Sequence, residues 1–238
     1  MKLELDRKYY LRFSDFDKFS NIKPSSVLDI FQDIASAHAE LLGIGFNALD
    51  SKNLLWVVAR TKFETVKNPE KYSEINIKTW PLSPKGLVCR REYLMTDKDS
   101  SVLIKGSSDW LVIDKSTRKP VRPDGIYPKN SEFLTDCMTE ERLRRIKPAE
   151  SFDRTFEITP AFSYADVNGH VNNIKYADMA FDALNPENSR LKAFQIDYHN
   201  EIKPYEKLIL SVFEENGRAV ISGETEESEK AYTCEVIF

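Results

Sequence analysis

The chain has 238 residues, of which 41% are hydrophobic and 30% charged, enough to bury one large core or two smaller ones. Its net charge of −4 and lack of a long basic tract argue against a nucleic-acid partner. No apolar run reaches the length of a membrane span, no signal-peptide core opens the chain, and Cys89, Cys137 and Cys234 are widely spaced, so we expect a cytoplasmic protein.

The N-terminal half begins with a predicted strand over residues 7–13 and a helix that starts near Ser25 or Ser26. Apolar side chains recur along this helix at the spacing of one face, and Gly43 and Gly45 end it. Segments rich in β-branched and aromatic residues follow, which predicts four strands: residues 54–66, 75–80, 86–95 and 102–114. One helix followed by antiparallel strands is an α+β unit.

Prolines punctuate residues 115–150, and the charged run at 139–147 (TEERLRRIK) is compatible with a short helix. After this segment the strand texture returns, at residues 152–158, 194–202, 207–215, 219–226 and 231–238. We therefore expect an N-terminal domain over residues 1–130, a linker over 131–150 and a C-terminal domain over 151–238.

The two halves are similar to each other. An offset of 149 residues aligns five identical pairs: Phe13 with Phe162, Ser14 with Ser163, Asp17 with Asp166, Asp29 with Asp178 and Asp33 with Asp182. At the same offset Phe19 stands where the second half has Asn168, and Asn21 where it has His170. A duplicated fold with one working site is the natural interpretation.

The candidate site lies in residues 163–184. Asp166, Asn168 and His170 occupy alternate positions, so in an extended segment they would share one face. Asn172 or Asn173 then caps a predicted helix, whose N-terminal N–H groups favour an anion or a developing oxyanion. The alternative is a polar turn whose Asp and Asn side chains only satisfy backbone groups.

Three segments together carry a resemblance to a known family: N-L-L-W-V-V-A-R at 53–60, D-V-N-G-H-V-N-N-x-x-Y from 166, and I-D-Y-H-N-E-I at 196–202. In order and spacing they resemble the acyl-acyl-carrier-protein thioesterases. The resemblance implies two tandem hotdog domains, each a long helix wrapped by an antiparallel sheet. It also implies hydrolysis of the thioester between a fatty acyl chain and acyl carrier protein, which terminates chain elongation. The implied catalytic groups are Asp166, Asn168, His170 and Glu201.

The chain departs from some members of that family at Ile202, where they carry a Cys directly after the Glu, so attack by a thiol there is impossible. Plant members carry a plastid transit peptide, and nothing similar precedes Met1, which favours a bacterial-type cytoplasmic enzyme. The resemblance further places the acyl chain in the N-terminal domain, in a tunnel lined by some of these residues: Val27, Ile30, Phe31, Ile34 and Trp56.

Several roles stay open at this level. Glu201 or Asp166 could take a proton from water, His170 could act as base or donor, and N–H groups near Val171 to Asn173 could hold the oxyanion. For the acidic carrier protein we expect a basic docking patch, with an ordinary solvated face as the alternative; the candidates are Arg90, Arg91, Arg142, Arg144, Arg145 and Lys147.

No cofactor and no metal site is expected, because no dinucleotide, phosphate-loop or metal-ligand pattern occurs. His38 is expected to be a hydrogen-bonded core residue and His199 a surface residue. The chain is expected to be a monomer or homodimer. Two alternatives are an acyl-CoA thioesterase or other hotdog acyl-thioester enzyme, and an acyl-binding module without activity.

Overall fold

The structure is a computed structural model that describes residues 3–187 and 190–238. The N-terminal half contains β1 (Leu5–Tyr10), the 3-10 turn η1 (Phe13–Asp15), α1 (Pro24–Leu41), α2 (Phe46–Asp50), β2 (Leu54–Thr65), β3 (Glu74–Pro81), β4 (Cys89–Thr96), β5 (Val102–Asp114) and β6 (Pro120–Val121). The C-terminal half contains β7 (Arg154–Ile158), η2 (Phe162–Tyr164), α3 (Asn173–Leu184), β8 (Ala193–Tyr198), β9 (Leu208–Glu215), β10 (Arg218–Thr225) and β11 (Lys230–Ile237).

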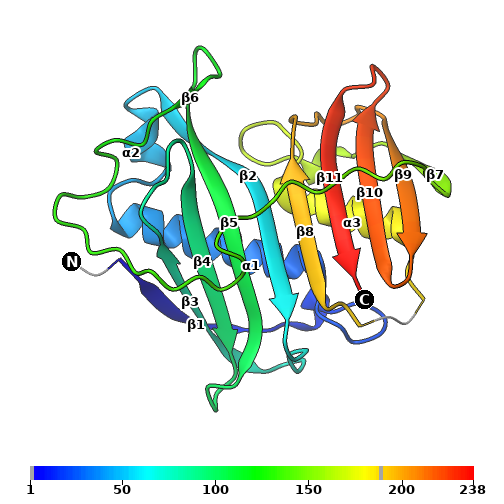
Figure 1. Cartoon of the computed structure of the whole chain (residues 1–238), viewed down its shortest axis with the longest axis horizontal. Coiled ribbons are helices and arrows are strands. Elements are labelled where there is room, and N and C mark those ends of the chain that lie inside the picture. Colours follow the sequence, from blue (N-terminus) through cyan, green and yellow to red (C-terminus); the bar gives the residue numbers. More distant parts are fainter. Residues whose placement is uncertain (1–2, 188–189) are drawn as a thin grey trace.

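Within the described residues, eleven strands form one antiparallel sheet that runs through both halves (Figure 1). The strand order is β1-β3-β4-β5-β2 in the first half and β8-β11-β10-β9-β7 in the second, and β6 pairs with β5. The two halves meet where β2 pairs with β8, with Arg60 opposite Asp197 and Phe63 opposite Phe194. Each half therefore supplies the same unit, and the predicted α+β class is confirmed.

Both long helices lie behind the sheet in Figure 1 and contact each other. α1 begins at Pro24 itself, whose missing N–H costs nothing in the first turn of a helix. The apolar face of α1 and that of α3 belong to one hydrophobic core, which includes Ile30 from α1 and Met179 from α3. Because this core is continuous across the β2–β8 junction, the two halves pack as one body. None of the described helices is long and apolar enough to cross a membrane.

The segment between β6 and β7 crosses the opposite face of the sheet (Figure 1). Its backbone is held by charged and polar side chains of the strands: Arg90 binds Glu140 O, Arg60 binds Leu143 O, Gln195 binds Arg144 O, and Asp197 accepts from Ile146 N–H. These bonds keep the segment extended, so the expected short helix at 139–147 is wrong. The domain boundaries at 130 and 150 stay a prediction.

Two of the six proposed docking residues are buried. Arg90 lies beside Glu92 and Asp109 under the crossing segment, and only 6% of its surface is exposed. Arg91 lies on the helix-facing side, hydrogen-bonded to His38 Nδ1 at 3.1 Å. The expectation that this pair belongs to a docking patch is therefore wrong, whereas Arg142, Arg144, Arg145 and Lys147 are exposed.

Candidate active site

Residues 166–170 form a tight turn, not an extended strand. Asp166 N–H donates to His170 O at 2.9 Å, and Gly169, at φ +81°, donates to Asp166 O at 3.0 Å. The Asp166 carboxylate accepts from the backbone N–H of Asn168 at 2.8 Å and from its side-chain amide at 3.4 Å. Asp166 thus satisfies backbone groups of its own turn, and the expected alternation of the three side chains along one strand face is wrong.

Glu201 lies beside this turn because the loop after β8 is tied to it. Val171 N–H donates to Ile202 O at 2.8 Å, and Ile202 N–H donates to the Tyr176 hydroxyl at 3.0 Å. Burial raises the pKa of Tyr176, so this hydroxyl stays neutral. The result is that Glu201 Oε2 lies 3.5 Å from His170 Nε2. The carboxylate and imidazole that the sequence singled out, 31 positions apart in the chain, therefore meet.

A third ionisable side chain, that of Arg118, completes this cluster, and sequence reasoning missed it. Arg118 lies in the turn between β5 and β6, in the N-terminal half, and its guanidinium contacts Glu201 Oε1 at 2.6 Å. The side chains of both residues are about half exposed. No local pattern marks Arg118, because it stands 83 positions from Glu201 in a loop of ordinary composition.

The N-terminal end of α3 opens beside His170. The Asn172 side chain caps the helix by accepting from Ile174 N–H at 3.1 Å. The N–H groups of Val171 and Asn172 are already used, the first by Ile202 O and the second by Tyr164 O. The three expected oxyanion donors were the N–H groups of residues 171–173. Among the described residues, only the N–H of Asn173, the first helical residue, has no hydrogen-bond partner.

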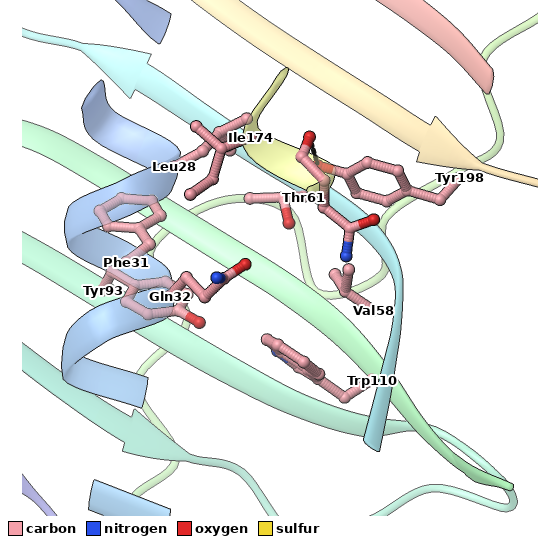
Figure 2. Close-up of a pocket in the computed structure, with 10 residues that line it drawn as sticks. Leu28, Phe31, Gln32, Val58, Thr61, Tyr93, Trp110, Ile174 and Tyr198 are labelled. Atoms are coloured by element: carbon pink, nitrogen blue, oxygen red, sulfur yellow. Dashed lines mark hydrogen bonds between the residues drawn. The ribbon is translucent and has the colours of Figure 1, made fainter. Parts of the chain in front are cut away.

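A cavity of about 20 Å³ lies between this helix end and α1. Figure 2 shows its lining side chains converging from α1, β2 and β8. The lining residues are Leu28, Phe31, Gln32, Val58, Thr61, Tyr93, Trp110, Asn173, Ile174 and Tyr198. A cavity of this size holds about one water molecule, so a longer guest needs the lining side chains to move.

The five residues expected to line an acyl tunnel are distributed as follows. Phe31 lines the cavity and stacks on Tyr93, with ring centroids 4.0 Å apart. Val27, Ile30 and Ile34 are buried in the main core next to it. Trp56 packs against a separate small cluster near α2, and its indole N–H donates to Ile44 O at 2.9 Å. A tunnel through these positions stays a prediction.

The first repeat builds the same turn without the chemical groups. Asp17 N–H donates to Asn21 O at 2.8 Å, and the Asp17 carboxylate accepts from Phe19 N–H at 2.9 Å, as in the 166–170 turn. Asn68 follows β2 as Glu201 follows β8, and its side chain accepts from Ile22 N–H at 3.0 Å. The first repeat therefore has the backbone of the site with neither the carboxylate–imidazole pair nor an ionisable group at position 68.

The remaining histidines and the thiols lie away from this pair. Burial, with Arg91 alongside, lowers the pKa of His38 to about 4, which fits the expected hydrogen-bonded core residue. His199 is exposed, as expected, and is paired with Thr233 Oγ1 at 3.2 Å. Burial raises the pKa of Cys89 to about 12 and raises that of Cys234 and of the less buried Cys137. Within the described residues, no three His, Cys, Asp or Glu side chains converge as metal ligands.

Comparison with known proteins accounts for this architecture. The acyl-ACP thioesterase N-terminal domain matches residues 2–127, and the acyl-ACP thioesterase C-terminal domain matches residues 147–236. A chloroplastic palmitoyl-acyl carrier protein thioesterase of Arabidopsis thaliana is 28% identical over 194 residues, which are 74% of this chain and 47% of that protein. The chain spans about half the length of the first curated relatives that it matches.

Solved structures give the same fold. An acyl-ACP thioesterase from Bacteroides thetaiotaomicron superposes with a TM-score of 0.87 at 24% identity, covering 99% of this chain and 97% of the other. The 12:0-ACP thioesterase from Umbellularia californica superposes with a TM-score of 0.86 at 18% identity, covering 99% and 96%. At these identities the likeness shows the fold, which is the expected pair of tandem hotdog units. From the two domain matches, which together cover most of its length, the chain belongs to the acyl-ACP thioesterase family.

Proposed function

We propose that this protein hydrolyses the thioester between a fatty acyl group and acyl carrier protein, releasing a free fatty acid and so ending chain elongation. The observation that carries the proposal is the Glu201–His170 pair beside the free N–H at the start of α3. The family to which the chain belongs supports the same reaction. A protein that only bound acyl groups would need no carboxylate and imidazole in contact at this place.

In the proposed reaction Glu201 takes a proton from a water molecule, and the resulting hydroxide attacks the thioester carbonyl carbon. The carbonyl oxygen gains negative charge, which the Asn173 N–H at the positive end of α3 stabilises. The C–S bond then breaks, the thiolate leaves, and the proton held by Glu201 passes to it. His170 lies next to Glu201 and orients the same water molecule through a hydrogen bond.

Asp166 and Asn168 have different roles in this proposal. The Asp166 carboxylate is engaged by the backbone and side chain of Asn168, and Asp17 makes the matching backbone bond in the first repeat. A role that both repeats share is structural, so we assign Asp166 to holding His170 in place. Asn168 is exposed next to it and is available to orient the carbonyl group.

Attack by water, without a thiol intermediate, is supported by the state of the cysteines. Cys89 and Cys234 are buried, and burial raises their pKa values, so both thiols are neutral near pH 7. Cys137 lies in the segment that crosses the sheet, and burial raises its pKa as well. A neutral thiol is a poor nucleophile, and Ile202 stands next to Glu201.

The bound acyl chain is proposed to extend from the thioester into the cavity beside α1. Asn173 lines this cavity and is also the proposed oxyanion donor, so a chain attached to the carbonyl carbon points toward Phe31 and Tyr93. Ile30 and Ile34, on the same helix, belong to the same hydrophobic core as Phe31. We retain the N-terminal half as the acyl-binding part, with Phe31 as the residue that must move first.

The proposed partner is acyl carrier protein, and the proposed location is the cytoplasm, which the three free thiols support. The test compares hydrolysis of one acyl group presented on acyl carrier protein and on coenzyme A. We expect free fatty acid from both, with a higher kcat/KM for the carrier-protein substrate. Equal or reversed values would make the protein an acyl-CoA thioesterase, and no hydrolysis of either would contradict the proposed function.

A further inference from the structure

The turn between β5 and β6 is built so that it carries one side chain into the site. Asp114 Oδ1 accepts from the N–H groups of Ser116 and Thr117, at 3.0 and 2.7 Å. Asn53 donates to Asp114 Oδ2 at 3.1 Å, and Arg118 N–H donates to Asp114 O at 2.9 Å. The bonds to its carboxylate, from Thr117 first and then from Ser116 and Asn53, lower the pKa of Asp114, so the carboxylate that organises the turn stays ionised.

Arg118 stands in this turn with φ +57°, in the left-handed region that favours Gly or Asn. This conformation is unfavourable for an arginine, and the turn by itself does not require an arginine at this position. Its guanidinium reaches the other half of the molecule and contacts Glu201 Oε1, while Glu201 Oε2 faces His170. Each oxygen of the Glu201 carboxylate thus has its own partner.

We propose that Arg118 is a positioning residue for the reaction, which rests on the function proposed above. Glu201 lies on an exposed loop and has three rotatable side-chain bonds, so without a restraint its carboxylate samples several orientations. Arg118 fixes one oxygen from the N-terminal half and leaves the other toward His170 and the water. The active site is therefore shared between the halves, although its motif lies in the C-terminal one.

Two other roles for Arg118 make different predictions. An ion pair between side chains about half exposed contributes little to stability, so a purely structural role would leave the rate unchanged. A role in binding the phosphate of the carrier arm would change KM and only for substrates that carry a phosphate. Loss of positioning instead lowers kcat for every thioester.

The test uses Arg118→Asn, which suits the left-handed backbone and removes the charge, with Lys119→Asn as the matched control in the same turn. Among the described residues, the Lys119 side chain makes no hydrogen bond or ion pair. The substrates are one fatty acyl group on acyl carrier protein and on N-acetylcysteamine, a small thiol without phosphate. We expect Arg118→Asn to lower kcat about 10- to 100-fold on both, the usual effect of misplacing a reacting group, with KM within about threefold of wild type.

Lys119→Asn should keep the wild-type rate, and Arg118→Lys, which keeps the charge, should recover most of the loss. In a Glu201→Gln background, Arg118→Asn should lower the residual kcat by no more than about twofold, because two residues that act through one step are not additive. Additive losses, an unchanged kcat, or a rise in KM on the carrier-protein substrate alone would each overturn the positioning role while leaving the hydrolase in place. A wild-type protein inactive on both substrates would overturn the proposed function as well.

Discussion

At the scale of single residues, the two repeats provide an internal comparison. Asp17 and Asp166 hold equivalent turns, but only the second turn ends in a histidine, His170, which faces Glu201. At the position of Glu201 the first repeat has Asn68, whose amide is used to hold backbone groups of the neighbouring turn. The proposed difference between a silent first site and a working second site therefore lies at three positions of one shared scaffold: Phe19 against Asn168, Asn21 against His170, and Asn68 against Glu201.

This comparison predicts different outcomes for two equivalent substitutions. Asp17→Ala should cost about 1–3 kcal/mol of unfolding free energy, because a charged hydrogen-bond acceptor is lost, and should leave kcat within about twofold. Asp166→Ala should cost a similar amount of stability and also lower kcat about 100-fold, because His170 loses its support. Steady-state kinetics and chemical denaturation of both variants measure this. A comparable loss of kcat in folded Asp17→Ala would contradict a single site.

At the scale of elements, most strands were predictable from composition and the two long helices from periodicity, but α2 was not predicted, and the strand expected over 194–202 ends at Tyr198. Residues 102–114, predicted as a strand, form β5 with those same bounds. The 166–170 segment was predicted less well, because the Asp166 carboxylate and the freedom of Gly169 to adopt a positive φ favour a turn over alternation. The 139–147 segment failed as a helix because strand side chains far away in sequence occupy its backbone groups. Arg118 had no sequence signal, since its role depends on two halves meeting in space.

The end of α1 predicts a dependence of stability on pH. Burial and Arg91 lower the pKa of His38 to about 4, while in the unfolded chain it returns to about 6.5. Between these values the unfolded state binds the extra proton, so stability falls as pH falls from about 6.5 toward 4. From pH 7 to pH 4.5 this one group should cost about 2–3 kcal/mol.

The measurement is denaturant unfolding of wild type and His38→Asn at pH 7 and pH 4.5. Asn keeps a hydrogen-bond acceptor for Arg91 and does not titrate. We expect the loss of unfolding free energy between the two pH values to be smaller in the variant by about 2–3 kcal/mol. Equal losses in the two proteins would show that His38 is not the group that titrates.

At the scale of the whole molecule, one face of the sheet packs against the two long helices, and the crossing segment covers the other. The helices and the core cover the first face, and residues 138–146 cover the buried charges of the second. Because the backbone of the crossing segment faces the sheet, its charged side chains Arg142, Arg144 and Arg145 are directed to solvent. They form the basic surface that remains after Arg90 and Arg91 are excluded.

Replacing Arg142, Arg144 and Arg145 together with Glu should raise KM for the carrier-protein substrate, because carrier proteins are acidic. The same variant should hydrolyse an acyl thioester of N-acetylcysteamine at the wild-type rate. Added salt should weaken the wild-type reaction with the same selectivity, since exposed charges are screened within about 8–10 Å at physiological ionic strength. Equal effects on both substrates would show that this surface does not dock the carrier protein.

Glu201 is proposed to activate water for thioester hydrolysis, and Glu201→Gln removes this role, because the amide keeps the shape of the carboxylate but takes no proton. The measurement is kcat for release of free fatty acid from fatty acyl-carrier protein by wild type and by Glu201→Gln, with Asn68→Asp as the reverse change, amide to carboxylate, at the equivalent position of the first repeat. We predict that the wild type hydrolyses this substrate and that Glu201→Gln lowers kcat by a factor of about 10²–10⁴, the range for losing a general base. Asn68→Asp should keep the wild-type kcat. A Glu201→Gln rate near that of wild type would contradict the claim.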